Sequence, residues 1–214
     1  MGGYQTSRFR ITGASPLLMH NGLLADPLNP HARSIAQVAA KRRKTEADHV
    51  RMAELEFLGG LYLNGGTPCI PAEMIQAALV RAAAQERRGS KAKAGLVVRE
   101  DLRLDYEGPT DPHTLWQDTT FRLRSPVRIG MSKIMRTRPM FREWSSELAV
   151  DFLPSLLNPQ DVVSFLVTAG EQVGIGDWRP RFGRFWVEEL PLLKTKGQRD
   201  HVHRVLPIQP RASR

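Results

Sequence analysis

A short segment rich in glycine and arginine is the part of the sequence best suited to holding an anionic ligand. Residues 173–185 read Val-Gly-Ile-Gly-Asp-Trp-Arg-Pro-Arg-Phe-Gly-Arg-Phe. Glycine tolerates positive φ and lets a backbone approach a ligand closely. Arginine binds phosphates through paired hydrogen bonds and stacks on flat rings. The segment therefore predicts a loop that contacts the backbone of a nucleic acid.

The expected contacts of this glycine-rich loop are Gly174, Gly176, Trp178, Arg179, Arg181, Gly183 and Arg184. The rings of Trp178 and Phe182 offer stacking planes for bases. In the alternative interpretation both rings pack on the core and the arginines are merely solvated. The loop is neither a Walker loop, because no Gly-Lys-Ser/Thr follows, nor a dinucleotide fingerprint, because it follows a helical pattern.

Residues 121–144 form a second basic segment, in which methionines alternate with cations. Its basic residues are Arg122, Arg124, Arg128, Lys133, Arg136, Arg138 and Arg142, and its methionines are Met131, Met135 and Met140. A hairpin with basic flanks and apolar tips suits wedging between stacked bases, a role we assign to Met131 and Met135. Alternatively, the methionines fill a gap in the core or a subunit contact.

Two further basic features complete the predicted interface. The run Lys41, Arg42, Arg43 and Lys44 is either a phosphate clamp or a solvated helix end. Arg81 lies on a predicted helix and joins the candidate contacts. The histidines show no metal-ligand spacing, including the pair His201 and His203 near the C-terminus, so we expect no metal and no cofactor.

The composition agrees with a polyanionic partner. The 214 residues include 31 Lys+Arg and 22 Asp+Glu, a formal net charge of +9. Such a chain usually meets nucleic acid, an anionic membrane surface or an acidic protein; the alternative is that a genome of high GC content enriches arginine regardless of function. Cys69, the single cysteine, excludes an internal disulfide. With no signal peptide and no apolar run of membrane length, we expect a cytoplasmic protein that does not enter membranes.

The elements that position these residues follow from periodicity and capping signals. Strands are expected at residues 8–12, 61–63, 96–98, 102–106, 121–124, 127–129, 147–152 and 185–187. Helices are expected at 46–58, 71–88 and 159–173, while 20–33, 90–94 and 130–142 look irregular.

Without its insertions the order is β-α-β-β-α-β, which predicts an α+β, ferredoxin-like palm like that of the RNA-recognition module. We expect one palm over residues 1–190 with insertions at about 20–66 and 119–144, the second a thumb-like β-hairpin. Residues 191–214 form a basic C-terminal tail.

Three segments resemble the RAMP superfamily of CRISPR proteins. They are the glycine-rich loop, the first strand with its turn (residues 11–19), and the Ile-Pro segment leading into a helix that ends in Leu-x-Arg (residues 69–81). The likeness is greatest to the repeated backbone subunit of Cascade-type effector complexes, although this chain and its glycine-loop spacer are short. A stand-alone relative carried by a phage or mobile element is equally compatible.

The resemblance implies a subunit that assembles side by side along single-stranded RNA or DNA, with residues 121–144 as the thumb. It implies partners of two kinds: the strand, and either copies of the same chain or other effector subunits, as in antiviral defense. Some relatives cut RNA with an acidic residue after the first strand, which makes Asp26 a candidate for metal-dependent cleavage. A third hypothesis is an assembly protein of a mobile element with an acidic partner.

Overall fold

An antiparallel sheet of four strands is the centre of the fold in the computed structural model, which describes residues 3–191. Its strand order is β10-β1-β9-β5. The strands are β1 (Gln5–Gly13), β5 (Leu96–Val97), β9 (Ser145–Phe152) and β10 (Phe185–Leu190). The chain is thus an α+β protein, as the sequence predicts.

The alternation of β1 decides which face of this sheet is buried. Phe9 and Ile11 are fully buried, and Phe9 lies opposite Leu148 of β9. Arg8 and Arg10 point to the other face, where both donate to the Glu147 carboxylate at 3.2 and 2.5 Å. Because side chains alternate along a strand, a single β1 supplies both the core and a charged surface.

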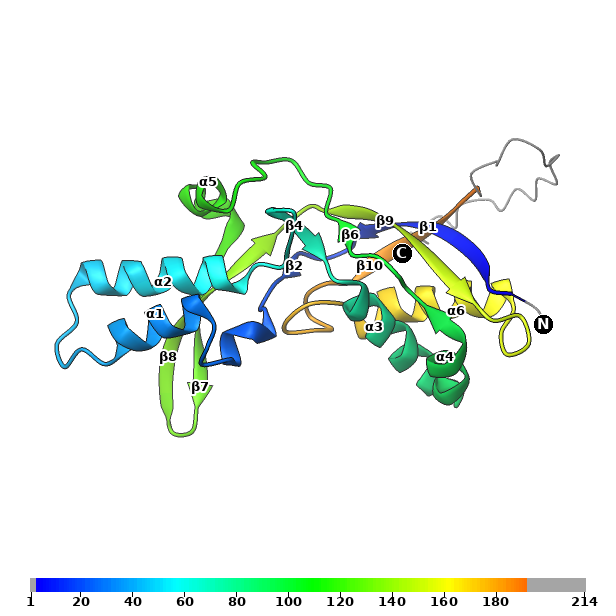
Figure 1. Ribbon diagram of the computed structural model, residues 1–214, viewed down its shortest axis with the longest axis horizontal. Coiled ribbons are helices and arrows are strands. Elements are labelled where there is room, and N and C mark those ends of the chain that lie inside the picture. The colour runs from blue at the N-terminus through cyan, green and yellow to red at the C-terminus, as the bar shows by residue number, and fades with distance from the viewer. Residues whose placement is uncertain (1–2, 192–214) are drawn as a thin grey trace, which may run out of the picture.

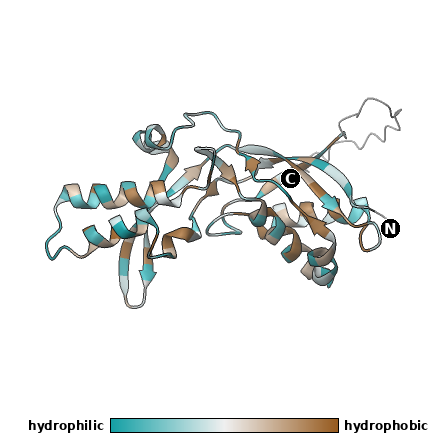
Figure 2. Ribbon diagram, viewed as in Figure 1, coloured by the Kyte–Doolittle hydropathy of each residue, from teal (hydrophilic) through white to brown (hydrophobic). Residues whose placement is uncertain are grey.

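Three helices cover the buried face of the sheet (Figure 1). They are α3 (Ala72–Gln85), α4 (Gly89–Gly95) and α6 (Pro159–Thr168), the last continued by a π-helical turn, η3 (Ala169–Val173). Leu79 and Phe165 are fully buried against Phe9 and Ile11 in one apolar core. Figure 2 shows many apolar residues along these helices and strands.

A second lobe makes the molecule elongated (Figure 1). It contains the short η1 (Gly22–Ala25), the helices α1 (Pro30–Ala39), α2 (Glu46–Gly60) and α5 (Pro112–Gln117), and the turn η2 (Thr119–Phe121). It also holds a three-stranded sheet of order β2-β8-β7, from β2 (Leu17–Leu18), β7 (Arg122–Ile129) and β8 (Ser132–Phe141). Strands β7 and β8 form a hairpin that extends away from the body.

A small third sheet of order β3-β4-β6 joins the two lobes. Its strands are β3 (Leu63–Asn64), β4 (Thr67–Ile70) and β6 (Leu102–Arg103). Ile70 is fully buried and leads directly into Pro71, the N-cap of α3. This sheet therefore fixes the start of the helix that carries Arg81.

Three segments expected to be irregular are ordered elements, and here the predictions are wrong. Asn29 caps α1 by accepting from the backbone N–H groups of His31 and Ala32, with Pro30 at the first helical position. The small-residue segment 89–95 is helical because Ala92 packs fully buried in the core. Residues 132–141 form β8, whose ladder with β7 runs from Ser132 to Pro139.

The expected boundaries also shift at the ends of elements. Helix α3 ends at Gln85 rather than Arg88, because Arg87 adopts a left-handed φ of 59°. Strand β7 continues through Pro126. Proline has no backbone N–H to donate, but it is tolerated here because β7 is an edge strand and has no neighbour on its outer side.

Nearly all of the predicted C-terminal tail, with His201 and His203, lies outside the described residues. Within residues 3–191 no helix has both the length and the apolar character needed to cross a membrane.

Candidate nucleic-acid interface

Backbone hydrogen bonds fold the glycine-rich loop against the turn that follows β1. The loop closes on itself where Ile175 N–H donates to the Gly183 carbonyl at 2.9 Å. Gly183 N–H donates to the Pro16 carbonyl at 2.8 Å, and Arg184 N–H donates to Ser15 Oγ at 3.0 Å. The glycine-rich loop and the turn after β1 are thus in direct contact.

Close backbone approach explains the glycines of the loop. Gly176 and Gly183 have φ of 78° and 71°. A Cβ atom on Gly176 would lie 2.4 Å from the Leu18 carbonyl oxygen, and one on Gly183 would lie 1.8 Å from that of Ile175. These glycines are required by the fold itself, whatever the loop binds.

An ion pair joins the loop to the β7–β8 hairpin. Arg138 Nε donates to Asp177 Oδ2 at 2.5 Å, and Arg138 is largely buried. Its guanidinium carbon lies 4.8 Å from the ring centroid of Trp178, which itself lies 6.0 Å from the ring of Phe182. Trp178 is therefore half-buried beside a cation. It is neither fully packed in the core nor fully exposed for stacking on a base.

A cavity of about 390 Å³ opens where the loop meets the start of α3. It is lined by His20, Tyr62, Pro71, Glu73, Met74, Gly176, Asp177 and Arg179. The Tyr62 hydroxyl donates to the His20 carbonyl at 3.0 Å. Desolvation, reinforced by the charge of Arg138, lowers the pKa of His20, and desolvation raises that of Tyr62. Both side chains are therefore neutral at pH 7, so the charged groups in the lining are the cation of Arg179 and the carboxylates of Glu73 and Asp177.

Arg179 is the predicted contact with the most unusual surroundings. It is half-buried, and desolvation followed by the charge of Arg81 lowers its pKa. Asp177, the acidic group that opposes this effect most strongly, already binds Arg138. An anion in the cavity would relieve the repulsion between the two arginines.

The remaining arginines of the loop are exposed. Arg181 lies 5.8 Å from the ring centroid of Phe182, and Arg184 Nε donates to the Pro180 carbonyl at 2.9 Å. Among residues 3–191 neither guanidinium forms an ion pair, so both remain available to phosphates.

The hairpin separates the two methionines predicted to wedge between bases. Met131 follows Gly130 at the tip and is 98% exposed, the position that the hypothesis requires. Met135 lies farther up β8, on the wall of a second cavity between the hairpin and α2. Met140 is buried where β8 pairs with β2. Met131 therefore lies at the tip, whereas Met135 is 47% exposed on the side of the hairpin, and its wedge role stays a prediction.

The cations of the hairpin fall into two groups. Arg124, Arg128, Lys133 and Arg142 are exposed and form no ion pair within the described part of the chain. Arg136 Nη1 instead donates to Glu56 Oε1 at 2.5 Å, and Arg138 is paired with Asp177. Their charges are compensated, so these two arginines position the hairpin rather than offer free cations.

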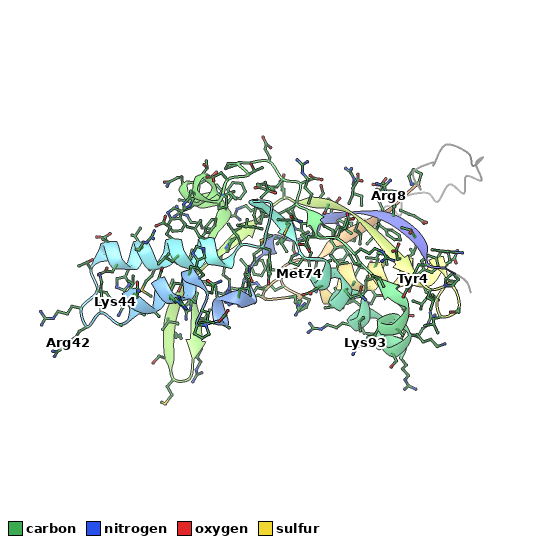
Figure 3. The ribbon with its side chains drawn as sticks, in the orientation of Figure 1. Tyr4, Arg8, Arg42, Lys44, Met74 and Lys93 are labelled. Atoms are coloured by element: carbon green, nitrogen blue, oxygen red, sulfur yellow. The ribbon has the colours of Figure 1, made fainter. Side chains whose placement is uncertain are left out.

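The basic run 41–44 lies between α1 and α2, at the far end of the second lobe, where Figure 3 labels Arg42 and Lys44. Lys41 Nζ bonds Asp48 Oδ1 at 2.6 Å, next to the capping box that starts α2 at Thr45. Arg42 and Arg43 are exposed and have no ion pair among residues 3–191. Lys41 therefore supports the start of α2, and the role of the two arginines as a phosphate clamp stays a prediction.

Asp26, the candidate catalytic residue, is exposed and ends η1. Its Oδ1 accepts from Leu28 N–H at 2.8 Å, the local bond typical of an aspartate in a turn. No group of three or more His, Cys, Asp or Glu suited to a metal ion occurs among the described residues. Cleavage at Asp26 stays a prediction.

Sequence reasoning missed Glu56, which shapes this interface, and it did not predict the partner of Arg122. Glu56 is buried in α2 and accepts from Arg136 and from Thr137 N–H, which ties α2 to β8. Arg122 stacks on Trp116 of α5 with its guanidinium carbon 4.1 Å from the ring. A glutamate on an otherwise apolar helix face was the available signal for Glu56.

The chain matches no protein-family model, and a search of the curated proteins finds no significant match.

Proposed function

We propose that this protein binds a single-stranded nucleic acid, RNA in preference to DNA, along the glycine-rich loop and the β7–β8 hairpin. The observation that carries the proposal is the position of Arg179. It lines a cavity at the base of the loop and lies close enough to Arg81 for that charge to lower its pKa. Arg81 and Arg179 are neighbouring cations, and Asp177, the acidic group that acts most strongly on Arg179, is already engaged by Arg138, which supports a phosphate contact at Arg179.

We propose in addition that the four-stranded sheet is a ferredoxin-like palm. The order β10-β1-β9-β5, with all neighbours antiparallel and with α3 and α6 on one face, supports this assignment. In this arrangement the glycine-rich loop of the palm would hold the phosphate backbone of the nucleic acid, while the β7–β8 hairpin reaches its bases.

The tip of the hairpin suits a wedge role. Met131 is an apolar side chain that is almost completely exposed, and it is flanked by Arg128 and Lys133, which lie opposite each other in the ladder. Insertion of an apolar side chain between base steps is an established way to unstack a nucleic acid, and flanking cations would neutralise the phosphates on either side. Side-by-side copies, as the RAMP resemblance implies, would repeat this wedge along the strand.

Mobility shift of the full chain on single-stranded RNA and DNA of about thirty nucleotides, at rising salt, tests the proposal. We expect tight binding at low ionic strength that weakens steeply with salt. The double variant Arg179→Ala, Arg181→Ala should bind more weakly and with a salt slope smaller by about two, one for each lost phosphate contact.

Arg103→Ala is the matched control, because Arg103 is highly exposed on β6 and pairs with Asp105 at 3.4 Å. It should bind like the unmodified chain. If the protein binds no single strand at low ionic strength, the proposed function is wrong. If the variant Arg179→Ala, Arg181→Ala binds as tightly as the unmodified chain, the nucleic acid binds elsewhere on the protein.

A further inference from the structure

The face of the central sheet opposite the helices carries an exposed tryptophan. Trp186 of β10 is 62% exposed, whereas its neighbour Phe185 is buried in the core. Because successive side chains of a strand point to opposite faces, Trp186 lies on the open face with Arg8 and Arg10 of β1. A single exposed apolar side chain is ordinary on a protein surface, so its neighbours decide what Trp186 binds.

The residues beside Trp186 across the sheet are small. Thr12 of β1 lies directly opposite Trp186, and Ser145 of β9 lies opposite Thr12. Directly paired residues are the nearest neighbours on one face of a sheet, and neither of these two side chains is large enough to cover an indole. Within residues 3–191 no aromatic ring and no guanidinium group stacks on Trp186. The indole is therefore a flat apolar surface that is open to a planar group.

The segment just before Trp186 is the end of the glycine-rich loop. Arg184 lies two residues earlier, and its carbonyl accepts from Ala14 N–H at 2.8 Å, which extends the pairing of β10 with β1. Residues separated by two positions along a strand are about 6.6 Å apart. A nucleotide whose phosphate contacts Arg184 can therefore place its base on Trp186.

The charges of the open face limit this contact to one end of β10. Glu188 follows Trp186 on the same face and lies opposite Arg10, whose guanidinium already donates to Glu147 at 2.5 Å. Beyond Trp186 this part of the face thus presents a carboxylate and a compensated cation, which do not attract phosphates. On the loop side, Arg184 is exposed and forms no ion pair among residues 3–191. A strand that arrives from the loop therefore reaches Trp186 and goes no farther along β10.

We propose that Trp186 stacks on one base of the strand whose phosphates the glycine-rich loop contacts. The inference rests on the proposed function and adds a base contact on the palm, distinct from the wedge at Met131. Every base has a flat face, so stacking of this kind is tolerant of sequence. In a duplex the bases are already paired and stacked on one another, so this contact selects single strands.

Binding of two labelled strands of about thirty units each to Trp186→Ala tests this contact. One strand is oligouridylate, and the other is an abasic strand of tetrahydrofuran-phosphate units. Trp186→Ala should bind oligouridylate about tenfold more weakly, the loss expected for one stacked base. Because the variant loses no phosphate contact, the salt dependence of its affinity should not change. Its affinity for the abasic strand should equal that of the unmodified chain.

Two further variants separate stacking from an ordinary apolar contact. Trp186→Phe keeps a flat ring and should retain most of the affinity for oligouridylate, whereas Trp186→Leu keeps only apolar surface and should bind like Trp186→Ala. Equal affinities of these two variants would overturn the stacking contact. Tyr4→Ala is the matched control, because Tyr4 is 45% exposed and lies just before β1, at the end of that strand away from the loop (Figure 3). It should bind both strands like the unmodified chain.

The outcomes distinguish this inference from the proposed function. Trp186 is exposed, so we expect its variants to fold, and circular dichroism checks this. If Trp186→Ala binds oligouridylate as tightly as the unmodified chain, or loses affinity for the abasic strand to the same extent, the stacking contact alone is overturned. If the unmodified chain binds neither strand at low ionic strength, the proposed function is wrong and the stacking contact is wrong with it.

Discussion

Arg138 of β8 donates to the Asp177 carboxylate of the glycine-rich loop, with Nε and Oδ2 2.5 Å apart. The two residues belong to segments far apart in the sequence, so their ion pair fixes the hairpin relative to the loop. Arg138 Nη1 is buried without a hydrogen-bond partner in the described structure, and the guanidinium carbon lies 4.8 Å from the centroid of the Trp178 ring. Arg138 is therefore held by a strong ion pair although one of its buried N–H groups has no partner. The Asp177 carboxylate is the group that compensates its charge.

We expect Asp177→Asn to destabilise the protein by about 1–3 kcal/mol, because it leaves the buried guanidinium of Arg138 without a counter-charge. Urea unfolding followed by circular dichroism measures the change. The charge-neutralising variant of an exposed pair, Asp105→Asn beside Arg103, should shift the unfolding free energy by less than about 1 kcal/mol. Equal effects in the two variants would show that the Arg138 contact contributes no more than a surface pair.

Two glycines of similar conformation separate steric crowding from backbone strain. Gly183 and Gly130 have φ of 71° and 58°, but a Cβ on Gly183 would lie 1.8 Å from the Ile175 carbonyl oxygen, whereas one on Gly130 meets nothing within 4 Å. Gly130→Ala should therefore lower stability by about 1–2 kcal/mol, the strain of a left-handed residue. Gly183→Ala should lower it further or prevent folding.

Thermal melting of the two glycine variants tests this difference. The comparison also bears on the loop's chemistry: if Gly183→Ala melts no lower than Gly130→Ala, the loop is free to move, and its glycines serve ligand approach rather than the fold.

The sequence predicts the central elements well where local and tertiary signals agree. The helices expected at 46–58 and 159–173 both begin at capping boxes, Thr45 with Asp48 and Asn158 with Asp161, and the strand expected at 8–12 lies within β1. Helix α4 was missed because its glycines and lysines have no helical pattern, and the buried Ala92 stabilises it through packing. Such tertiary stabilisation leaves little signal in one sequence.

The sequence predicts which basic residues belong to the candidate site, but not which of them form ion pairs. The sequence identifies the arginines of the loop and hairpin, yet it treats Arg136, Arg138 and Arg128 alike. Only the fold shows that Arg136 and Arg138 are paired with Glu56 and Asp177, whereas Arg128 is exposed. These pairs join residues 80 and 39 positions apart in the sequence, a separation at which no local rule acts.

Glu56 should stabilise the hairpin through both of its oxygens. One accepts from Arg136 at 2.5 Å and the other from Thr137 N–H at 2.8 Å, and the residue is 6% exposed. Glu56→Gln replaces one acceptor with a donor and removes the charge, so we expect a loss of about 2–4 kcal/mol. Glu54→Gln, on the same helix beside the exposed Arg51, is the control and should cost less than about 0.5 kcal/mol.

Hydrogen exchange provides the local readout for Glu56. Faster exchange confined to the β7–β8 hairpin would place its effect there. Uniform exchange throughout the chain would contradict a specific link between α2 and β8.

The last prediction concerns acid stability. Arg88 binds both oxygens of Asp161 at 2.5 Å, and this bond is the largest cause that lowers the pKa of Asp161. A carboxyl whose folded pKa lies below its unfolded value of about 3.9 contributes stability above that value and loses it as the pH falls through the folded pKa. Asp161→Asn should therefore melt below the unmodified chain at neutral pH, and the gap should narrow below about pH 4.

Melting temperatures between about pH 7 and pH 2.5 measure this gap. Arg88→Gln should show the same narrowing, because the low pKa depends on the guanidinium. The double variant Arg88→Gln, Asp161→Asn should be little less stable than either single variant, since the two residues act as one pair. A gap that stays constant with pH would show that Asp161 stabilises the start of α6 only through its capping bond to Asn158 N–H, 3.0 Å away.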